Sequence, residues 1–595
     1  MDKSYEYESY EKAADAEQAE KEFRSKKRRN AIVITMSTVI LISVAIFFLI
    51  GISTFDNSRS DHKSSSSLLN SSSQVISALC NVTRYQELCY SSMSSALELE
   101  ATSSNDTNGK EPGLGELFLI SLKIALNESS KLSNLPTKIM SSEDYFSEIS
   151  DTLVQSALNA CEKLFMDATD RIKDSISAME VGQGDNNMVL ITSSIIDIRT
   201  WLSTAITDHE TCIDGVQETG RQSITDEMTE AVAISTKYTS NSLAIFSNVW
   251  AIVNDVNIRF HRKLLTSVAG FPRWVERRLL REENLKPNVT VAKDGSGDFK
   301  TINEALKLIP RMSSSRFVIY VKEGVYVENV TIDVYGWNVM MYGDGMDKTI
   351  VSGSKNMADG VTTYYSATFA AEGQGFIARD MGFVNTAGPE KFQAVALRSS
   401  SDRSVFYRCS FEAYQDTLYT HTNRQFYRDC RISGTIDFIF GNAAVVFQNC
   451  SIHLKQALKN QFSVITCQGK SDPNQNSGFS LQRCQITPDA DLTMPAFLGR
   501  PWRDYATTVV MESFMGRFLD PLGWVELNPN GGPPTATFYG EFQNDGPGSA
   551  IGGRVRWPGV KPNLTTEEAA RFSVEELIQG SQWLPEANVE YDTKL

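Results

Sequence analysis

Two aspartates, Asp416 and Asp437, stand 21 residues apart (437 − 416) in a stretch that is otherwise rich in aromatic and branched aliphatic side chains. Neither lies where a helix cap or a tight turn would account for it. Two carboxylates that are brought together repel each other, so that one of them holds a proton or needs a cation. Carboxylate pairs whose pKa values are driven apart carry out acid/base or nucleophilic chemistry. The pair therefore predicts a catalytic site, provided that the fold places both side chains together.

A repeat of about 20 residues in the C-terminal half predicts such a fold. Four segments share one frame, with a cysteine between apolar positions: FYRCSF, YRDCRI, FQNCSI and LQRCQI, which contain Cys409, Cys430, Cys450 and Cys484. Equivalent positions of a parallel β-helix stack about 4.8 Å apart. Residues 286–595 are therefore predicted to form an all-β, right-handed parallel β-helix. A disulfide within the cysteine column, with Cys430 and Cys450 as candidates, is compatible with this fold but is not required by it.

The catalytic candidates follow the same repeat. Asp416 and Asp437 are separated by the same step as the first two repeat cysteines, so they should lie one rung apart on the same face. Gln393 precedes Gln415 by 22 residues and extends the column by one more rung. A ladder of stacked polar side chains that satisfy one another is the structural alternative. The adjacent carboxylates favour a site instead, and so do four aromatic neighbours that would partly desolvate them: Tyr414, Tyr419, Phe438 and Phe440.

The segment LGRPW, Leu498–Trp502, offers two further groups. Arg500 can hold one carboxylate ionised and oriented through two parallel hydrogen bonds. Trp502 offers a flat face for a sugar ring, although an ordinary Arg-Pro turn is the structural alternative. The chain has no G-x-S-x-G, H-E-x-x-H or C-x-x-C motif, and His421 and His453 are expected to be structural or on the surface. No metal site and no cofactor are predicted.

The N-terminus predicts a membrane anchor. No charged residue lies between Arg29 and Asp56, and Ala31–Ile52 is long enough to span a bilayer. A buried core helix is the alternative, but such helices are rarely so long and so free of charge. Because KKRR precedes the segment, residues 1–30 are predicted to stay in the cytosol and the rest to be exported. An uncleaved signal anchor over 31–52 is favoured over a short cleaved signal peptide.

Other features agree with export. Several N-x-S/T sequons follow the anchor, and the glycosylation candidates among them are Asn81, Asn127, Asn288, Asn329 and Asn563. The nine cysteines permit disulfides in an oxidising compartment, and because nine is odd, at least one stays unpaired or bonds elsewhere. The net charge of −15 lies mostly in the first half of the chain. The nearly balanced remainder argues against a nucleic-acid partner.

Three segments are predicted between the anchor and the β-helix. Residues 53–73 are a Ser-rich linker, and residues 74–255 are an all-α four-helix bundle, because apolar residues recur there at three- and four-residue steps. The four cysteines of this region could close a small hairpin and tie two helices together, as Cys80 with Cys89 and Cys161 with Cys212. Residues 256–285 are a linker with basic candidate processing sites, at Arg262, Arg277 and Arg278. A solvated charged turn is the alternative for these basic residues.

Five motifs together resemble the plant pectin methylesterases: GVYVE, QAVALR, YQDTLY, DFIFG and LGRPW, in this order, over most of the chain from Lys286 to Glu590. The helical region resembles, more loosely, the pectin methylesterase inhibitor domain, through CNVTRYQELC and the two later cysteines. The resemblance implies a pectinesterase that hydrolyses the methyl esters of homogalacturonan to pectate and methanol. It also implies that the inhibitor-like region is an autoinhibitory pro-region, removed at the basic sites before the enzyme reaches the cell wall.

The resemblance also implies roles for the site residues. Asp437 would be the nucleophile, and Asp416 the general acid that later acts as base. Gln393 and Gln415 would stabilise the oxyanion. Arg500 would hold Asp437 ionised, while Trp502, with Trp524 as a further candidate, would bind the sugar chain. The implied partners are pectin, proteinaceous pectin methylesterase inhibitors, a processing protease and, before processing, the membrane.

The sequence departs from the family pattern at Ala413, Phe392 and Cys467, but none of these changes removes a catalytic group. Cys467 is the candidate for the unpaired thiol. Two other functions remain as alternatives. One is a binding or inhibitor protein that acts through its helical region, and the other is a lyase on the same solenoid, which would need a calcium-binding acid cluster. Methanol release from pectin distinguishes both from the esterase.

Overall fold

The computed structural model describes residues 65–103, 114–145, 148, 151–181, 187–264, 286–528, 531 and 534–595. Residues Ser72–Leu595 form one unit and Met1–Ser71 another. The predicted cytosolic tail 1–30, the predicted anchor Ala31–Ile52 and the basic pair Arg277–Arg278 lie outside the described residues. Within the described part, no helix is long and apolar enough to cross a membrane.

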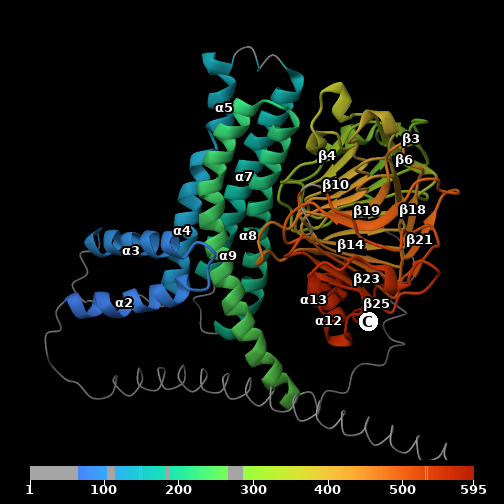
Figure 1. Cartoon of the computed structure of the whole chain (residues 1–595). Helices are drawn as coiled ribbons and strands as arrows, with labels where there is room; N and C mark the ends of the chain where they lie inside the picture. The colour runs from blue at the N-terminus through green and yellow to red at the C-terminus, as the bar shows by residue number, and fades with distance from the viewer. Residues whose placement is uncertain are drawn as a thin grey trace, which may run out of the picture. The chain divides into compact units, whose positions relative to one another are not determined.

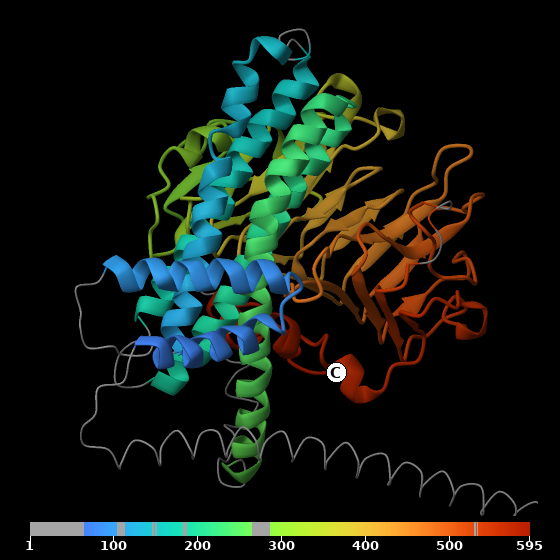
Figure 2. The same ribbon diagram turned by 60° about the vertical axis from the view of Figure 1, so that its left-hand side comes forward.

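The N-terminal half is helical, as predicted. Its α-helices are α2 (Ser65–Cys80), α3 (Gln86–Ser103), α4 (Leu114–Leu132), α5 (Leu135–Met140), α7 (Thr152–Val181), α8 (Asn187–Glu218) and α9 (Gln222–Leu264). Helices α4, α7, α8 and α9 pack side by side (Figures 1 and 2), with contacts from α4 to α7, α7 to α8, α8 to α9 and α9 back to α4. Helix α7 shows why they pack, since Val154, Leu158, Cys161 and Phe165 recur at helical spacing and are all buried.

Two helices extend past the predicted limits of this region. Helix α2 begins at Ser65, inside the predicted linker 53–73, because Ile76 and Cys80 anchor its buried face and serine extends a helix at small cost. Helix α9 continues beyond the predicted boundary at 255 to Leu264. The candidate processing site Arg262 therefore lies in the last turns of a helix.

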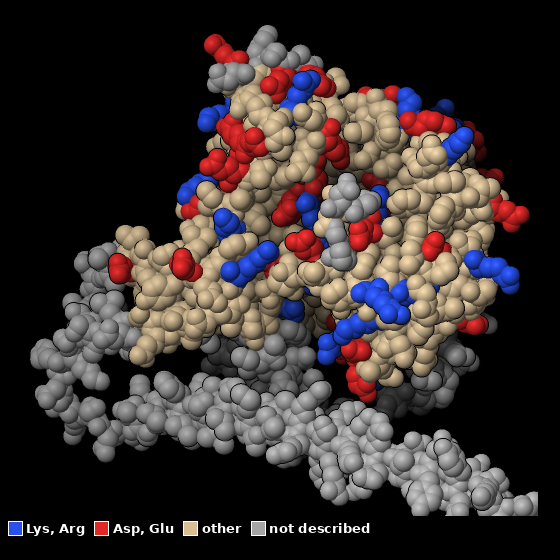
Figure 3. Space-filling model, viewed as in Figure 1, with Lys and Arg blue, Asp and Glu red and all other residues tan. Residues whose placement is uncertain are grey.

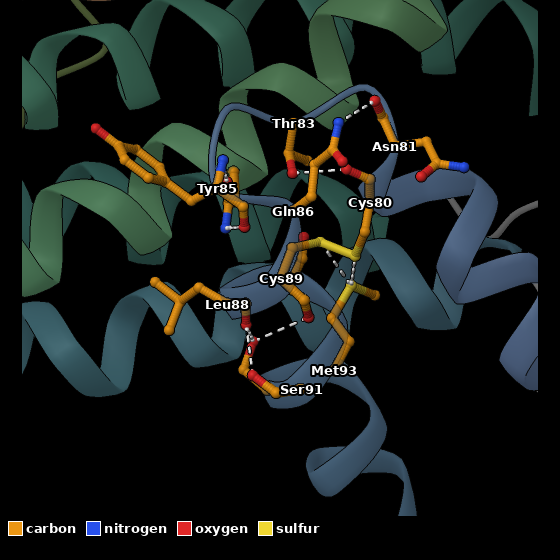
Figure 4. The surroundings of a disulfide bond; sticks show 12 residues. Cys80, Asn81, Thr83, Tyr85, Gln86, Leu88, Cys89, Ser91 and Met93 are labelled. Atoms are coloured by element: carbon orange, nitrogen blue, oxygen red, sulfur yellow. Dashed lines mark hydrogen bonds between the residues drawn. A yellow bond between two sulfur atoms is a disulfide. The ribbon is translucent and has the colours of Figure 1, made fainter.

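Two disulfides hold the helical region together, with the pairings that the sequence suggested. Cys80 and Cys89 join the end of α2 to the start of α3, and Met93 Sδ lies 3.9 Å and 3.8 Å from their sulfurs (Figure 4). The turn between them is closed by Thr83 Oγ1, which donates to the Cys80 carbonyl over 2.8 Å. Cys161 and Cys212 join α7 to α8.

The C-terminal half is a parallel β-helix, in which three parallel sheets run along the coil (Figures 1 and 2). In stacking order the first sheet holds β1 (Val289–Val291), β2 (Phe317–Val321), β5 (Val339–Tyr342), β8 (Ile377–Arg379), β11 (Ser404–Tyr407), β14 (Arg424–Arg428), β17 (Ala444–Gln448), β20 (Gly478–Gln482), β23 (Thr507–Met511), β25 (Phe538–Phe542) and β26 (Val560–Lys561). The second holds β3 (Gly324–Val327), β6 (Thr349–Gly353), β9 (Gly382–Asn385), β12 (Ser410–Glu412), β15 (Arg431–Gly434), β18 (Ser451–Leu454), β21 (Gln485–Pro488) and β24 (Phe514–Met515). The third holds β4 (Val330–Ile332), β7 (Phe369–Ala371), β10 (Leu397–Ser399), β13 (Leu418–Thr420), β16 (Ile439–Gly441), β19 (Ser463–Gln468) and β22 (Ala496–Pro501).

The strand register confirms the predicted repeat. Phe406 pairs with Tyr427 on the next rung, and Tyr427 pairs with Phe447, with ring centroids 4.6 Å and 4.8 Å apart. The four repeat cysteines follow these strands and are buried in the same core. Stacked aromatic rings and thiols therefore fill the interior of the coil, as expected of a solenoid whose equivalent positions stack from rung to rung.

The disulfide candidates Cys430 and Cys450 are not bonded to each other, because both are free and buried thiols. Their sulfurs face backbone carbonyl oxygens of the preceding rung, 3.3 Å from Phe406 for Cys430 and 3.6 Å from Tyr427 for Cys450. The column therefore acts as packing, and the candidate disulfide of the β-helix is wrong.

Short helices cover parts of the β-helix. They are α11 (Ile302–Leu306), α12 (Thr566–Ala570), α13 (Val574–Ile578) and α14 (Leu584–Ala587). The last of these helices pack on the outer face of the first sheet, where Val574 and Ile578 bury against Val405 and Phe426. On the face seen in Figure 3, basic and acidic side chains are interspersed, without the continuous basic surface that nucleic acid requires.

Trp524 is not a sugar-binding face. Its side chain is fully buried and stacks on the Tyr539 ring with centroids 4.2 Å apart. Replacing it by alanine is expected to lower the free energy of unfolding by about 3–5 kcal/mol, because the change leaves a large cavity in the core. Denaturant unfolding measures this loss. Leu522→Ala, at a side chain that is 47% exposed, is the control and should change stability little. A Trp524→Ala protein of unchanged stability would contradict this assignment.

Candidate active site

The two aspartates occupy equivalent positions on adjacent rungs. Strands β13 and β16 pair with Leu418 opposite Ile439, and Asp416 and Asp437 each lie two residues before these positions. Both aspartates have positive φ angles, 64° and 50°, a conformation that aspartate tolerates better than most residues. Their side chains are nearly buried, with 7% and 8% of the residue exposed. The predicted juxtaposition one rung apart is therefore present at the entry to the third sheet.

Arg500 binds only one of the two carboxylates. It lies on β22, two rungs beyond β16, and is in register with Cys467 and Phe440. Its Nε donates to Asp437 Oδ1 over 2.8 Å, and its Nη2 donates to Asp437 Oδ2 over 2.6 Å. This bidentate geometry orients the Asp437 carboxylate.

Asp416 has a different electrostatic environment. Burial and the neighbouring negative charge of Asp437 raise the pKa of Asp416 well above its usual range, and the charge of Glu218 adds to this effect. Arg500 opposes the shift without reversing it. Asp416 therefore holds a proton under conditions in which an ordinary aspartate is ionised. The pair thus has one oriented carboxylate beside one carboxylic acid.

A single cavity of about 330 Å³ brings the predicted site residues together. The residues that were proposed from the sequence and that line it are Gln393, Gln415, Asp416, Asp437, Arg500 and Trp502. Tyr419 and Phe440 also line it, with stacked rings 4.2 Å apart. The free thiol of Cys467 is buried at the same cavity. The predicted constellation is therefore one site, with aromatic walls that limit access of water.

Helix α8 forms the opposite wall of this cavity, which the sequence analysis missed. Thr211, Asp214, Gly215 and Glu218 all line it. A signal was present in the sequence, because Glu210, Asp214 and Glu218 follow one another at four-residue steps and so share one helix face. An acidic helix face is usually solvated, so that the pattern alone did not indicate a partner.

Polar contacts fasten α8 to the β-helix on both sides of the cavity. Arg503 forms ion pairs with Asp214 and Glu210, the latter over 3.4 Å. At one end of the contact, Thr363 N–H donates to Glu218 over 3.0 Å, and burial raises the pKa of Glu218 to about 7.

Further along the helix, three more hydrogen bonds continue this line. They are Asn442 Nδ2 to Thr207 Oγ1 over 2.8 Å, Thr204 Oγ1 to Asn423 Oδ1 over 2.8 Å, and Arg424 Nη2 to Asp197 Oδ1 over 2.7 Å. Helix α7 adds an ion pair from Lys163 to Glu372. The helical region thus packs over the site through these polar contacts and through an apolar cluster to which both regions contribute, with Ile213 and Val216 of α8 beside Tyr419 and Phe440.

The remaining predicted residues lie away from the chemistry. His421 is buried, bonds to Ser400 and Thr211 over 2.9 Å each, and is structural as expected. The asparagines of the five glycosylation candidates are all exposed, which leaves each accessible to modification: Asn81, Asn127, Asn288, Asn329 and Asn563.

Comparisons with known proteins agree with this geometry. Residues 288–581 match the family described as Pectinesterase, and residues 74–245 match Plant invertase/pectin methylesterase inhibitor. "Pectinesterase 3" of Phaseolus vulgaris is 50% identical over 529 residues, which cover 87% of each chain. "Probable pectinesterase/pectinesterase inhibitor 46" of Arabidopsis thaliana is 41% identical over 595 residues, covering 98% of this chain and 99% of the relative.

Among solved structures, the pectin methylesterase from carrot is 47% identical, with a TM-score of 0.51. The match covers 53% of this chain and 100% of the carrot chain. It therefore accounts for about the length of the β-helix, whereas the full-length relatives span the helical region as well. The chain belongs to the pectinesterase family of carboxylic ester hydrolases, and it carries an N-terminal region of the pectin methylesterase inhibitor family.

Proposed function

We propose that the chain hydrolyses galacturonate methyl esters of pectin with Asp437 as the nucleophile. The observation that carries this proposal is the unequal environment of two stacked aspartates. Arg500 binds Asp437 with two hydrogen bonds, whereas burial beside that charge keeps Asp416 protonated. One carboxylate is therefore prepared to attack and the other acid to donate a proton.

The reaction would proceed through an acyl-enzyme. One Asp437 oxygen attacks the ester carbonyl carbon, and the oxyanion that forms accepts N–H donation from the amides of Gln393 and Gln415. The C–O bond to methanol breaks as Asp416 donates its proton to the leaving oxygen. The Asp416 carboxylate then takes a proton from water, which attacks the acyl carbon, so that the carboxylate of pectate is released and Asp437 is regenerated.

The helical region would inhibit the enzyme to which it is attached. Helix α8 lies across the cavity and is fastened on both sides of it, by Glu218 at Thr363 and by Thr207 at Asn442. A polysaccharide needs a continuous groove through the site, and the docked helix occupies this path. Separate proteinaceous inhibitors of the same family would bind the same surface after the helical region has left.

Processing and export complete the proposal. The segment 31–52 would anchor the chain in the secretory pathway, and a protease would cut at Arg262 or at Arg277–Arg278 to release the mature enzyme into the cell wall. Cleavage at Arg262 requires the last turns of α9 to unfold, since proteases cut extended chain. The exposed sequons would carry glycans.

The test compares one preparation before and after cutting. The purified full-length chain should release little methanol from highly methylated pectin, and treatment with a protease specific for basic pairs should increase the release by orders of magnitude. N-terminal sequencing identifies the bond that was cut. A correctly cut and folded protein that releases no methanol would contradict the proposed function. Equal release before and after cutting would contradict inhibition only.

The contact of Arg503 with helix α8 gives a more specific prediction. The double change Glu210→Gln with Asp214→Asn removes both carboxylates that pair with Arg503 and leaves the β-helix unaltered. Loss of a largely buried charge pair costs about 2–3 kcal/mol, so the undocked fraction should rise about 30–150-fold. Methanol release from pectin by the uncut chain should rise by the same factor. Asp226→Asn, an exposed acid on α9, is the matched control and should have no effect. An uncut double variant as inactive as the parent would contradict the role of this contact.

A further inference from the structure

The docked helix covers the catalytic residues without filling the space above them. The cavity of about 330 Å³ lies between the third sheet and α8, with Asp416 and Asp437 on one wall and Asp214, Gly215 and Glu218 on the other. This volume falls within the range of about 300–1,000 Å³ that small-molecule sites occupy. The inhibited form therefore retains a site of single-sugar size directly over the reactive pair.

Gly215 keeps this space open. It is the residue of α8 at the cavity that has no side chain, and a Cβ placed on it would meet no atom within 4 Å. Its neighbours on the same face, Thr211 and Asp214, contact the β-helix through Tyr419 and Arg503. A larger residue at 215 would point into free space rather than into a packed interface.

The cavity opens to solvent at one rim. Gln217 and Leu527 line it and are both exposed, Leu527 by 39%. In the direction of the α8 axis, two contacts close the groove through the cavity: Glu218 with Thr363, and Thr207 with Asn442. A single sugar unit can therefore enter at the rim, whereas a chain that continues in both directions collides with α8.

The contact between Arg500 and Asp437 is present in the docked form. The two hydrogen bonds from Arg500 to Asp437 are formed while α8 is in place. Among the described residues, no hydrogen bond or ion pair joins α8 to Asp416 or to Asp437. The helix thus acts on the reactive pair only through the charge of Glu218, which helps to raise the pKa of Asp416, and it occupies no hydrogen-bonding position of either carboxyl group among the described residues.

The charges at the cavity select the ligand. Arg500 is paired with Asp437 and Arg503 with Asp214, so neither cation has a free charge to offer. Glu218, whose pKa burial raises to about 7, adds a further acid to the wall that carries a negative charge above this pH. A neutral methyl ester meets no net repulsion here, whereas a free uronate carboxylate approaches an acidic surface.

We propose that the uncut, docked chain binds one neutral uronic acid methyl ester in its catalytic cavity, while it excludes the methyl-esterified polymer. This inference rests on the proposed function, because it assigns the cavity to the ester that Asp437 would attack. Inhibition by the helical region is then selective for substrate size rather than complete.

The test uses the full-length chain with Arg262, Arg277 and Arg278 changed to alanine, so that the preparation stays uncut. Saturation-transfer NMR reports binding of three probes: the methyl ester of methyl galactopyranosiduronate, the corresponding free acid, and a fully methyl-esterified hexamer. The monomer ester should give a clear, saturable signal. We expect the free acid and the hexamer each to give a signal at least about tenfold weaker, because the wall charge excludes the first and α8 excludes the second.

Substitutions at Gly215 identify the site. Gly215→Trp should remove the monomer signal, and Gly215→Leu should reduce it at least about threefold, since each fills part of the cavity. Gly115→Trp is the matched control, because Gly115 is an exposed helical glycine whose added Cβ also meets no atom within 4 Å. Melting temperatures show which variants are folded. If Gly215→Trp does not fold, Gly215→Leu still tests the site.

Three results would overturn the inference: no monomer signal with the parent chain, an unchanged signal in a folded Gly215 variant, or a hexamer signal as strong as that of the monomer. A second assay separates this failure from failure of the proposed function. The natural chain, cut at its junction, is tested for methanol release from pectin. If the cut chain releases methanol but the uncut chain does not bind the monomer ester, only the inference is rejected. If the cut, folded chain releases no methanol, the proposed function is rejected.

Discussion

Asp437→Asn is expected to lower methanol release from methylated pectin by about 10⁴-fold or more, measured on the chain after it has been cut at its junction. An amide oxygen cannot form the acyl-enzyme. The Cys467 thiol lines the same cavity, but burial raises its pKa well above the usual range, so that it is a poor substitute nucleophile. The substitution keeps the size of the side chain and an oxygen that accepts a hydrogen bond from Arg500. The loss should therefore appear in kcat, with KM for pectin little changed.

The control for this variant is Asp347→Asn, which removes another Asp–Arg pair of the β-helix. Asp347 pairs with Arg431 on the surface, with 67% of its side chain exposed, so that its loss should change neither activity nor stability measurably. Circular dichroism and thermal unfolding establish that both proteins are folded. A folded Asp437→Asn protein with more than a tenth of the parent activity would reject Asp437 as the nucleophile.

Asp416→Asn should reduce kcat/KM by about 10²–10⁴-fold, which is the usual contribution of a general acid. The pH dependence gives a sharper test. The first step needs Asp416 in its protonated form, whose pKa is raised by burial and by the charge of Asp437. As pH rises through that raised pKa the acid form is lost, so that kcat/KM of the parent enzyme should fall on the alkaline side.

The asparagine variant has no proton to lose at this position. Its residual kcat/KM should therefore lack the alkaline decline that the parent shows, and a full pH profile of both proteins measures the difference. Were the decline to persist unchanged in the variant, the titrating acid would be a different group.

The sequence repeat predicted much of the β-helix and the placement of the site residues on it. Parallel rungs of equal length place each residue beside its equivalent one period later, so that the step from Asp416 to Asp437 determined their adjacency. The same reasoning located the buried cysteine column. It did not determine whether Cys430 and Cys450 bond, since that depends on the side-chain directions, which point the sulfurs at backbone carbonyls.

The local sequence pattern predicted the role of a residue less well where that role depends on burial. Trp524 has the residue type of a sugar-binding platform, but the chain beyond it folds back and stacks Tyr539 on its ring. Helices α2 and α9 extend into the predicted linkers, because serine-rich and basic segments have no strong preference of their own and continue the helices that they adjoin.

The sequence by itself determined the period of the coil, the rung on which each catalytic side chain lies and the division into a helical and a solenoid region. These properties depend on neighbours one period or one helical turn away, and such neighbours can be counted along the chain. Only the tertiary structure decided that the polar face of α8 lies over the catalytic cavity and that Gly215 leaves the cavity open. That contact joins surfaces about two hundred residues apart, and an acidic helix face looks the same in sequence whether water or Arg503 faces it.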